Sequence, residues 1–213
     1  MNICLLGNNL TNLVLANILL KKKINVDIIS QAKPTLLTNT VRTIAISNEN
    51  YKFLKENIKG VSNLGWPTEK IKIYSDKNKS SELFEFKNNN QKNFYLLKYS
   101  ALYNLMKKNK FLKFIQLKNY NLDVIRKLNY DLIINSEQNN PITKKYFQKK
   151  IENKIATQIF TKKGPIAFLP LSNNQTSIVF SNNSTKLMDK LSLLQIINKY
   201  NYQYKINKIS DVE

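Results

Sequence analysis

Apolar and polar positions alternate through the first thirty residues in an order typical of a βαβ unit. Asn2 to Leu6 is a short apolar run, and after a polar turn an apolar stretch continues to Leu20. A lysine cluster then precedes a second apolar run, Val26 to Ile29. This order predicts a strand, a tight turn, a helix and a second strand, as in dinucleotide-binding folds.

The turn of this unit differs from the usual glycine pattern. In a dinucleotide-binding unit GxGxxG occupies this turn, and the helix N-terminus binds a pyrophosphate. The three glycine positions are Gly7, Asn9 and Asn12 here. A side chain at the second position intrudes on the pyrophosphate, and one at the third separates helix from strand. Asparagine tolerates left-handed backbone better than most residues, so a working phosphate loop and a ligand-free turn both remain open.

The same periodicity predicts further elements along the chain. Helices are expected over Glu49–Ile58 (with Ser47 or Asn48 as N-cap), Tyr99–Lys108 and Lys186–Tyr200. Strands are expected over Ile71–Tyr74, Leu83–Phe86, Phe111–Leu117 and Leu132–Ile134, a hairpin over Ile166–Leu171 and Ser177–Ser181, and a turn over Gly65–Pro67. The expected fold class is α/β with an interposed antiparallel sheet.

Histidine and cysteine usage excludes several kinds of site. The chain has no histidine and one cysteine, Cys4, which excludes zinc and iron–sulfur centres, disulfide scaffolds and histidine-based triads. Cys4 lies in the first predicted strand, which favours a buried, inert thiol. The start has no charged n-region, and asparagines interrupt its apolar run, so we expect neither a secretory signal nor a membrane span. A cytoplasmic location follows.

The charge of the chain is strongly basic, with a formal net charge of +20. Only two of the 34 basic residues are arginines, Arg42 and Arg126, while lysine and asparagine abound. AT-rich coding produces this pattern, and arginine is the preferred reader of phosphates and bases. We therefore expect no specific nucleic-acid partner, whereas attraction to acidic lipid stays open. An RNA-binding protein would show a steep salt dependence of binding.

Three further segments carry recognisable motifs. Arg42–Ser47 has the sequence RTIAIS and precedes a predicted helix. Tyr130–Phe147 has the sequence YDLIINSEQNNPITKKYF, and Phe160–Ser181 has FTKKGPIAFLPLSNNQTSIVFS. These segments are similar to the patterns RxxALS, ADLLVGADGxxSxxR and FTxxGPLALLPLxxxxxSLVWS. Together with the βαβ unit, and in this order, they resemble the FAD-dependent aromatic hydroxylases of ubiquinone biosynthesis, flavoprotein monooxygenases related to para-hydroxybenzoate hydroxylase.

The resemblance implies a site for FAD. In that family the βαβ unit holds the ADP half, the arginine of the second motif lies along the flavin, and the GADG segment contacts the cofactor. Ser30 stands where the family has the ribose-binding acid, and Glu137 keeps the charge of GADG. The cofactor-binding residues implied are Gly7, Asn9, Asn12, Ser30, Arg42 and Glu137. No catalytic side chain is implied, because flavin and dioxygen supply the chemistry. The protein orients the substrate in a pocket from which water is excluded.

The resemblance also implies a domain organisation and an activity. Residues 1–70 and 95–150 would form a Rossmann-like FAD-binding part, and residues 71–94 and 151–213 an antiparallel-sheet substrate part. The expected reaction is NAD(P)H- and oxygen-dependent hydroxylation of the aromatic ring of a polyprenylated quinone precursor. A hydrophobic aromatic small molecule is then the substrate. The expected partners are a quinone-biosynthesis complex and the surface of the inner membrane.

A second interpretation is a relative that kept the fold and lost the cofactor. Its basis is the replacement of two glycines, together with the family's later GDAAH motif, which has no counterpart before Glu213. Such a protein would act as an accessory or lipid-binding subunit of a quinone-biosynthesis complex. A fragment, or one half of a split enzyme, is the further alternative.

Overall fold

The computed structural model describes residues 1–31, 42–75, 82–87, 94–117, 122–136, 145–147, 153–181 and 190–201. The chain divides into two compact units, each made of three segments. The first unit contains Met1–Asn39, Lys52–Leu64 and Ser100–Pro141, and the second contains Thr40–Tyr51, Gly65–Tyr99 and Ile142–Glu213. One boundary falls inside helix α2 (Asn48–Asn57).

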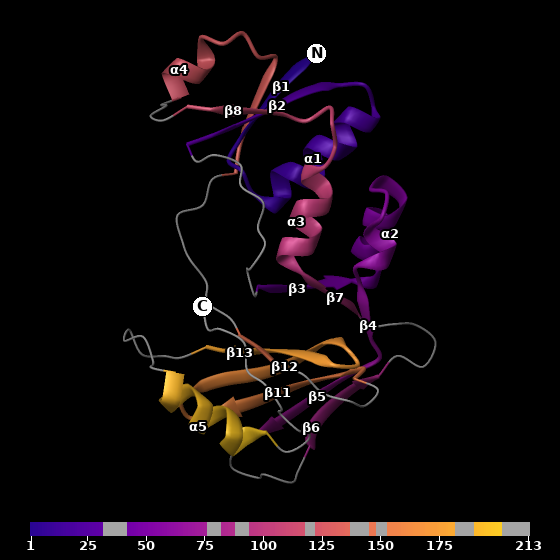
Figure 1. The fold of residues 1–213 in the computed structure, drawn as a ribbon, viewed down its shortest axis with the longest axis vertical. Helices are drawn as coiled ribbons and strands as arrows, with labels where there is room; N and C mark the ends of the chain where they lie inside the picture. The colour runs from indigo at the N-terminus through magenta and orange to yellow at the C-terminus, as the bar shows by residue number, and fades with distance from the viewer. Residues whose placement is uncertain are drawn as a thin grey trace. The chain divides into compact units, whose positions relative to one another are not determined.

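The first unit is built on a four-stranded parallel sheet with the order β8-β2-β1-β9. Its strands are β8 (Lys113–Gln116), β2 (Asn25–Ser30), β1 (Asn2–Leu6) and β9 (Leu132–Asn135). Its helices are α1 (Leu10–Lys21), α3 (Tyr99–Lys107) and α4 (Leu122–Arg126), and a short 3-10 turn covers Val61–Asn63 (Figure 1). Parallel strands place their carboxyl ends at one edge of the sheet, and the turn before α1 lies at that edge.

The core of this unit lies on both faces of the sheet. Cys4, Leu6 and Ile29 pack against Ile125 of α4 on one face. Side chains alternate along a strand, so Leu5, which is fully buried, lies on the opposite face. Burial on both faces is typical of parallel sheets, and it explains why β1 is apolar almost throughout.

The second unit contains two sheets. The six-stranded sheet has the order β10-β13-β12-β11-β5-β6, and only the β11–β5 pair is parallel. Its strands are β10 (Lys145–Phe147), β13 (Gln175–Phe180), β12 (Gly164–Ser172), β11 (Ile155–Thr161), β5 (Lys70–Ser75) and β6 (Glu82–Lys87). The antiparallel three-stranded sheet has the order β3-β7-β4, with β3 (Thr43–Ser47), β7 (Phe94–Lys98) and β4 (Trp66–Thr68).

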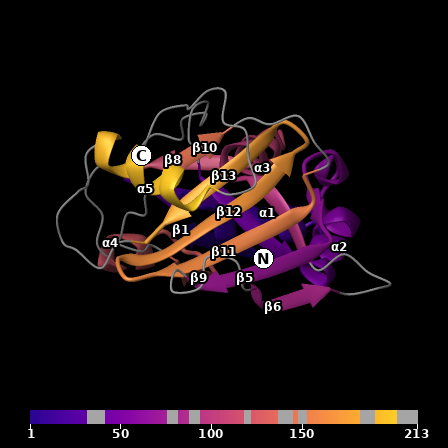
Figure 2. The ribbon, with the colours of Figure 1, turned by 90° about the horizontal axis from the view of Figure 1, so that it is seen from below.

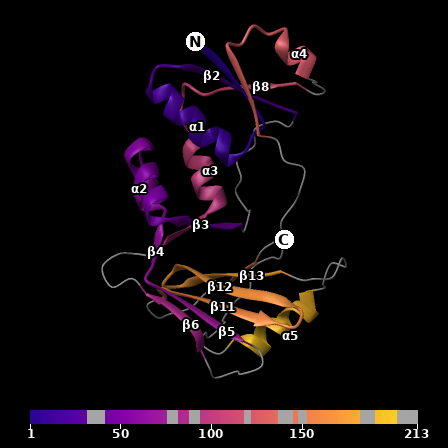
Figure 3. The ribbon, with the colours of Figure 1, turned by 180° about the vertical axis from the view of Figure 1, so that it is seen from behind.

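Helix α5 (Lys190–Tyr200) lies against the six-stranded sheet (Figures 2 and 3). Its residues Ile197 and Tyr200 pack with Ile159, Ile166 and Phe168 of the sheet. Phe168, which is 2% exposed, is thus a core residue of this unit. None of the helices in the described ranges is long and apolar enough to cross a bilayer.

The expected α/β fold class is confirmed, with a parallel sheet and separate antiparallel sheets. Ser47 is the N-terminal cap of α2, because its Oγ accepts a hydrogen bond from the N–H of Asn50 at 3.3 Å. Strand β4 replaces the turn expected at Gly65–Pro67, and Pro67 is tolerated because β4 is an edge strand. Strands β7 and β11 and helix α4 were not expected. Of the helix expected over Lys186–Tyr200, residues 186–189 lie outside the described residues.

Candidate functional site

A tight turn joins β1 to α1 at the carboxyl edge of the parallel sheet. Gly7 has φ of 105°, a left-handed conformation that glycine adopts without the steric cost of a Cβ. Its N–H donates to the carbonyl of Ile29 at 2.8 Å, which fixes the turn to the neighbouring strand β2. Gly7, the one retained glycine of the motif, therefore supplies the tight turn between β1 and α1.

Asn9 is the N-terminal cap of α1. Its backbone is extended, and its Oδ1 accepts a hydrogen bond from the N–H of Asn12 at 3.0 Å. The first helical hydrogen bond follows, from the N–H of Leu13 to the carbonyl of Asn9. Asparagine is among the preferred residues at this position. Its amide thus satisfies one of the N–H groups that the end of a helix leaves without a partner.

The other end of the Asn9 amide contacts the end of β9. Its Nδ2 donates to the carbonyl of Ser136 at 3.0 Å and to the Oγ of Ser136 at 2.8 Å. Ser136 in turn donates its N–H to the carbonyl of Leu6. Asn9 therefore bridges the ends of β1 and β9 at the edge where ligands bind in parallel α/β sheets.

Asn12 fills the space between α1 and β1. Its side chain is buried, and its Nδ2 donates to the carbonyls of Leu6 at 2.8 Å and Gly7 at 2.7 Å. The Oδ1 of Asn12 is buried without a hydrogen-bond partner. The opposite amide orientation would set Oδ1 against two carbonyl oxygens, so the contacts decide the orientation. This amide takes the place that a glycine leaves empty in the usual motif.

Ser30 ends β2 at the same edge of the sheet. It is buried, and its carbonyl accepts a hydrogen bond from the N–H of Leu117. Glu137 lies outside the described residues. The structure therefore brings four of the six predicted residues to one edge of the first unit: Gly7, Asn9, Asn12 and Ser30.

Arg42 belongs to the second unit, where it precedes β3. Its guanidinium carbon lies 4.8 Å from the centre of the Tyr99 ring, a cation–π contact. Its carbonyl accepts a hydrogen bond from the N–H of Tyr99 at 2.8 Å. The Nε of Arg42 is buried without a hydrogen-bond partner. A buried donor without an acceptor costs free energy, so this N–H is suited to an acceptor supplied by a ligand.

These residues fit a dinucleotide in part. A diphosphate binds a helix N-terminus through its N–H groups, and the conformation of Gly7 and the inward position of Asn12 leave that approach open. The Asn9 side chain obstructs this approach, because its Oδ1 and a phosphate oxygen would compete for the N–H of Asn12. The turn fits a diphosphate only with the Asn9 side chain turned away.

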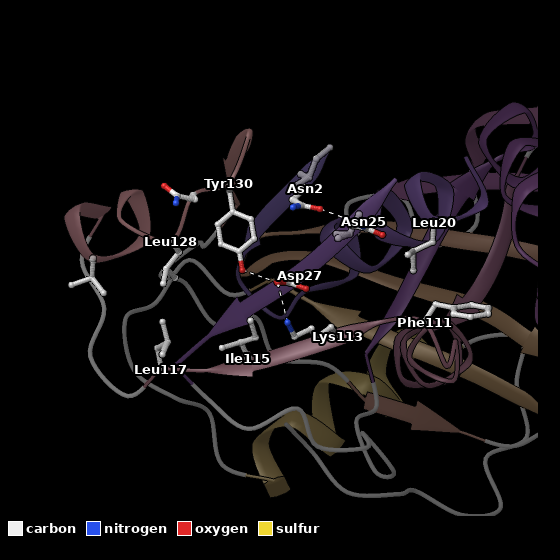
Figure 4. Close-up of a pocket in the computed structure, with 14 residues that line it drawn as sticks. Asn2, Leu20, Asn25, Asp27, Phe111, Lys113, Ile115, Leu117, Leu128 and Tyr130 are labelled. Carbon is white, nitrogen blue, oxygen red and sulfur yellow. Dashed lines mark hydrogen bonds and ion pairs between the residues drawn. The ribbon is translucent and has the colours of Figure 1, made fainter. Parts of the chain in front are cut away.

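A hollow of about 660 Å³ lies elsewhere in the first unit (Figure 4). The Tyr130 hydroxyl donates to Asp27 at 2.7 Å, and the Nζ of Lys113 lies 3.6 Å from the same carboxylate. Burial, followed by the hydrogen bond to Asp27, raises the pKa of Tyr130. No predicted site residue is among its described lining residues. Sequence reasoning missed this group, because 103 positions separate Tyr130 from Asp27. Among the described residues, the Asp27 carboxylate contacts Tyr130 and Lys113, and both contacts are within the first unit.

Cys4 is fully buried beside this group, as expected. Burial, with the negative charge of Asp27 as the smaller cause, raises the pKa of its thiol to about 11. The thiol is therefore protonated at neutral pH and a poor nucleophile. Within the described ranges there is no cluster of three or more side chains suited to a metal ion.

Comparison with known proteins identifies the fold. No protein-family model matches the chain, and no curated protein matches it. Klebsiella pneumoniae HpxO, solved with FAD and uric acid, has a TM-score of 0.60 at 11% identity over 96% of this chain and 62% of its own. The p-nitrophenol 4-monooxygenase PnpA from Pseudomonas putida has a TM-score of 0.67 at 6% identity, over 99% of this chain and 66% of its own.

A third structure, P. aeruginosa PqsL in complex with 2-aminobenzoylacetate, has a TM-score of 0.56 at 10% identity, over 84% of this chain and 59% of its own. The chain thus spans less than two thirds of the length of each of these proteins. Its fold is that of FAD-dependent monooxygenases.

Proposed function

We propose that this chain contains the FAD-binding part of an aromatic hydroxylase and the antiparallel sheet that lines its substrate pocket. The reaction is NAD(P)H- and oxygen-dependent hydroxylation of the ring of a polyprenylated phenol in ubiquinone biosynthesis. The observation that carries the proposal is the fold, which is shared over 94% of the chain with a protein complexed with FAD. One fold can serve many functions. The site residues, and the sequence motifs that resemble the hydroxylases of ubiquinone biosynthesis, therefore give the proposal its further support.

The site residues support a cofactor with acceptor groups. Gly7 and Ser30 lie at the carboxyl edge of the parallel sheet, where the ADP half of FAD would bind. Arg42 has a buried Nε without an acceptor, and a flavin carbonyl or a phosphate would satisfy it. Bound FAD would supply the redox chemistry, and the protein would supply binding and a dry pocket.

The second unit supports a hydrophobic substrate. On the face of the six-stranded sheet turned away from the α5 core, alternation and register place Ile71 beside Phe86 and Ile73 beside Phe84. Phe84 is 63% exposed and Phe86 is 53% exposed. Phe160 of β11 lies on the same face and is also exposed. An apolar face with three exposed aromatic rings could bind a polyprenylated ring or a lipid surface.

The test uses the two arginines of the chain as a matched pair. Arg42→Ala removes the guanidinium with its buried Nε and is expected to weaken FAD binding about tenfold, the effect of losing a charge-assisted hydrogen bond. Arg126→Ala is the control, because Arg126 is 70% exposed on α4 and its side chain pairs only with Asp123 among the interactions of the described residues. Flavin fluorescence and thermal stability in a titration with FAD measure both effects.

A protein that purifies colourless, and gains no thermal stability with excess FAD, would count against the proposal. Turnover is measured as NAD(P)H oxidation, together with mass spectrometry of a polyprenylated phenol for the added oxygen atom. Sedimentation with anionic vesicles tests the peripheral membrane contact. Purification from cells tests membership of a quinone-biosynthesis complex.

A cofactor-free accessory or lipid-binding subunit is the second candidate function. The observation that favours it is the Asn9 amide, which takes the N–H of Asn12 at the N-terminus of α1. This candidate expects a prenylated phenol to stabilise the protein while FAD does not. The flavin proposal expects FAD to stabilise it in the absence of any phenol.

A further inference from the structure

The Asn9 side chain is held at both ends of its amide. Its Oδ1 accepts the N–H of Asn12, and its Nδ2 donates to two oxygen atoms of Ser136. The opposite amide orientation would set a donor against the N–H of Asn12 and an acceptor against the carbonyl of Ser136. The hydrogen bonds with the N–H of Asn12 and with the carbonyl of Ser136 would then be lost, and only the Ser136 hydroxyl could adapt by donating instead, so the side chain has one fully satisfied orientation. We call these three hydrogen bonds the Asn9 bridge.

The Asn9 bridge uses groups that an anion at this turn would need. A phosphate at the start of a helix is bound by backbone N–H groups that have no other partner. Here one of those groups is satisfied within the chain, at a distance of 3.0 Å. The turn therefore disfavours an anion as it stands, because an N–H group that would bind the anion already has an acceptor within the chain.

The bridge also connects two strands. Asn9 follows β1 and Ser136 follows β9, and these strands pair in parallel through Leu6 and Asn135. In a parallel α/β sheet the ligand binds outside the carboxyl ends of such strands. A side chain that joins the two ends through hydrogen bonds lies across this place. Binding of a diphosphate there requires that the bonds to Ser136 break together with the helix cap.

We propose that Asn9 is an intramolecular competitor for the diphosphate subsite, and that its side chain sets the affinity of this chain for adenine dinucleotides. The inference rests on the proposed function, because it takes the β1–α1 turn as the site of the ADP half of FAD. A dinucleotide enters when the Asn9 side chain turns away from Asn12 and Ser136. Glycine at this position removes the competitor and leaves the turn itself in place.

The test is a titration of the full chain and of Asn9→Gly with FAD and with ADP, followed by calorimetry. We expect Asn9→Gly to bind both ligands about tenfold more tightly, which is the effect of removing a competing interaction of ordinary hydrogen-bond strength. Adenosine, which has no phosphate, is expected to bind both proteins equally. Because glycine is itself an acceptable N-cap, the substitution leaves α1 stable.

Two further variants complete the series. Asn25→Gly is the matched control, since Asn25 is an exposed asparagine at the amino end of β2, away from the β1–α1 turn, and its Nδ2 donates only to the Oδ1 of Asn2 among the hydrogen bonds of the described residues. It is expected to leave the affinity for FAD unchanged. Ser136→Ala removes the Oγ acceptor and leaves the carbonyl of residue 136, so its affinity is expected to lie between those of the original protein and Asn9→Gly.

Hydrogen exchange at the backbone N–H of Asn12 is a readout that does not depend on activity. In the ligand-free proteins this N–H is expected to exchange faster in Asn9→Gly, because its acceptor is gone. FAD is expected to restore the protection. If Asn9→Gly fails to fold, Asn9→Ser replaces it: serine still caps the helix but has no Nδ2 to donate to Ser136, so a smaller gain in affinity than for Asn9→Gly is expected.

The outcomes separate this inference from the proposed function. Equal, measurable affinity for FAD in the original protein and in Asn9→Gly overturns the inference and leaves the flavin proposal intact. Weaker binding by Asn9→Gly also overturns it, because Asn9 would then be part of the binding surface. If neither protein binds FAD, both the inference and the flavin proposal fail.

Discussion

Single side-chain amides decide the chemistry of the β1–α1 turn. Asn12 replaces a glycine, yet its Nδ2 satisfies two carbonyls at the end of β1. A buried polar group is tolerated when it forms hydrogen bonds, so this substitution preserves the packing of α1 on β1. Asn9 also forms hydrogen bonds, but it does so with groups that a ligand would need. The same residue type thus supports the fold at one position and competes with a ligand at the other.

Cys4 provides a test of burial at the residue scale. Burial and the charge of Asp27 raise the pKa of its thiol from 9.0 to about 11, so the folded state holds this proton more tightly than the unfolded state. Its contribution to the free energy of unfolding is therefore complete below pH 9 and is lost as the pH rises to about 11. The loss is about 2–3 kcal/mol for a shift of this size.

Urea unfolding at several pH values between about 8 and 11, with the original protein and Cys4→Ala, measures this contribution. Cys4→Ala is expected to be less stable at pH 8, because it leaves a cavity, and to lose less stability on raising the pH. The same pH slope in both proteins would show that the Cys4 thiol has an ordinary pKa. Tyr130 titrates in both proteins, and the charge of Cys4 is the smallest of the causes that raise its pKa, so most of its effect cancels in the comparison.

At the scale of elements, α2 is fixed to the three-stranded sheet by a stack of two tyrosines. The rings of Tyr51 in α2 and Tyr95 in β7 lie 3.8 Å apart at an angle of 17°. Gly65, just before β4, lies beside this stack, and a Cβ built there would meet ring atoms of Tyr51 at 2.5 Å. Any side chain at position 65 must therefore displace the Tyr51 ring.

Gly65→Ala is expected to lower the free energy of unfolding by about 1–3 kcal/mol, the usual cost of overpacking a core. Chemical denaturation measures this change. In the Tyr51→Ala background the ring is absent, so the same substitution is expected to cost much less. An equal cost in both backgrounds would mean that the clash with Tyr51 is not the cause.

At the scale of the whole molecule, charge is the dominant property. The formal net charge is +20, and like charges repel one another in the compact state. The ion pairs among the described residues, such as Lys72–Glu82 at 2.7 Å, are partly exposed. Exposed pairs contribute little to stability. Salt screens both the repulsion between like charges and the attraction within ion pairs. The loss of repulsion is therefore expected to be the larger effect.

Added sodium chloride is thus expected to raise the melting temperature. A gain of about 1 kcal/mol corresponds to about 2–4 °C for a chain of this size. Scanning calorimetry at low and physiological ionic strength measures the change, with an equal concentration of a neutral osmolyte as the control. A melting temperature that falls with salt would show that attractive pairs outweigh the net repulsion.

Most of the helices and strands could be predicted from the sequence, since their apolar spacing is a local property. The exceptions have physical reasons. Trp66–Thr68 was expected as a turn because Gly65 and Pro67 usually mark one, yet it pairs with β7 as an edge strand. Strand β11 (Ile155–Thr161) pairs in parallel with β5, and paired residues such as Ile155 and Lys70 are 85 positions apart, so no local pattern indicates this partner.

The candidate site was predictable to a smaller extent. The sequence indicated that Gly7, Asn9 and Asn12 share one turn, because the spacing of a βαβ unit requires it. It did not indicate Ser136 as the partner of Asn9, since 127 positions separate the two residues. It also did not indicate the buried, unpartnered Nε of Arg42, because the environment of a side chain depends on what packs around it.

The sequence by itself determined the order of the elements, the α/β class and the left-handed turn at Gly7, because each depends on neighbouring residues and their backbone preferences. Only the tertiary structure decided which polar groups meet, such as Asn9 with Ser136 and Tyr130 with Asp27. Those pairs depend on the pairing of strands distant in the chain. That pairing is set by the burial of whole strands and helices, not by the residues that finally form the hydrogen bonds.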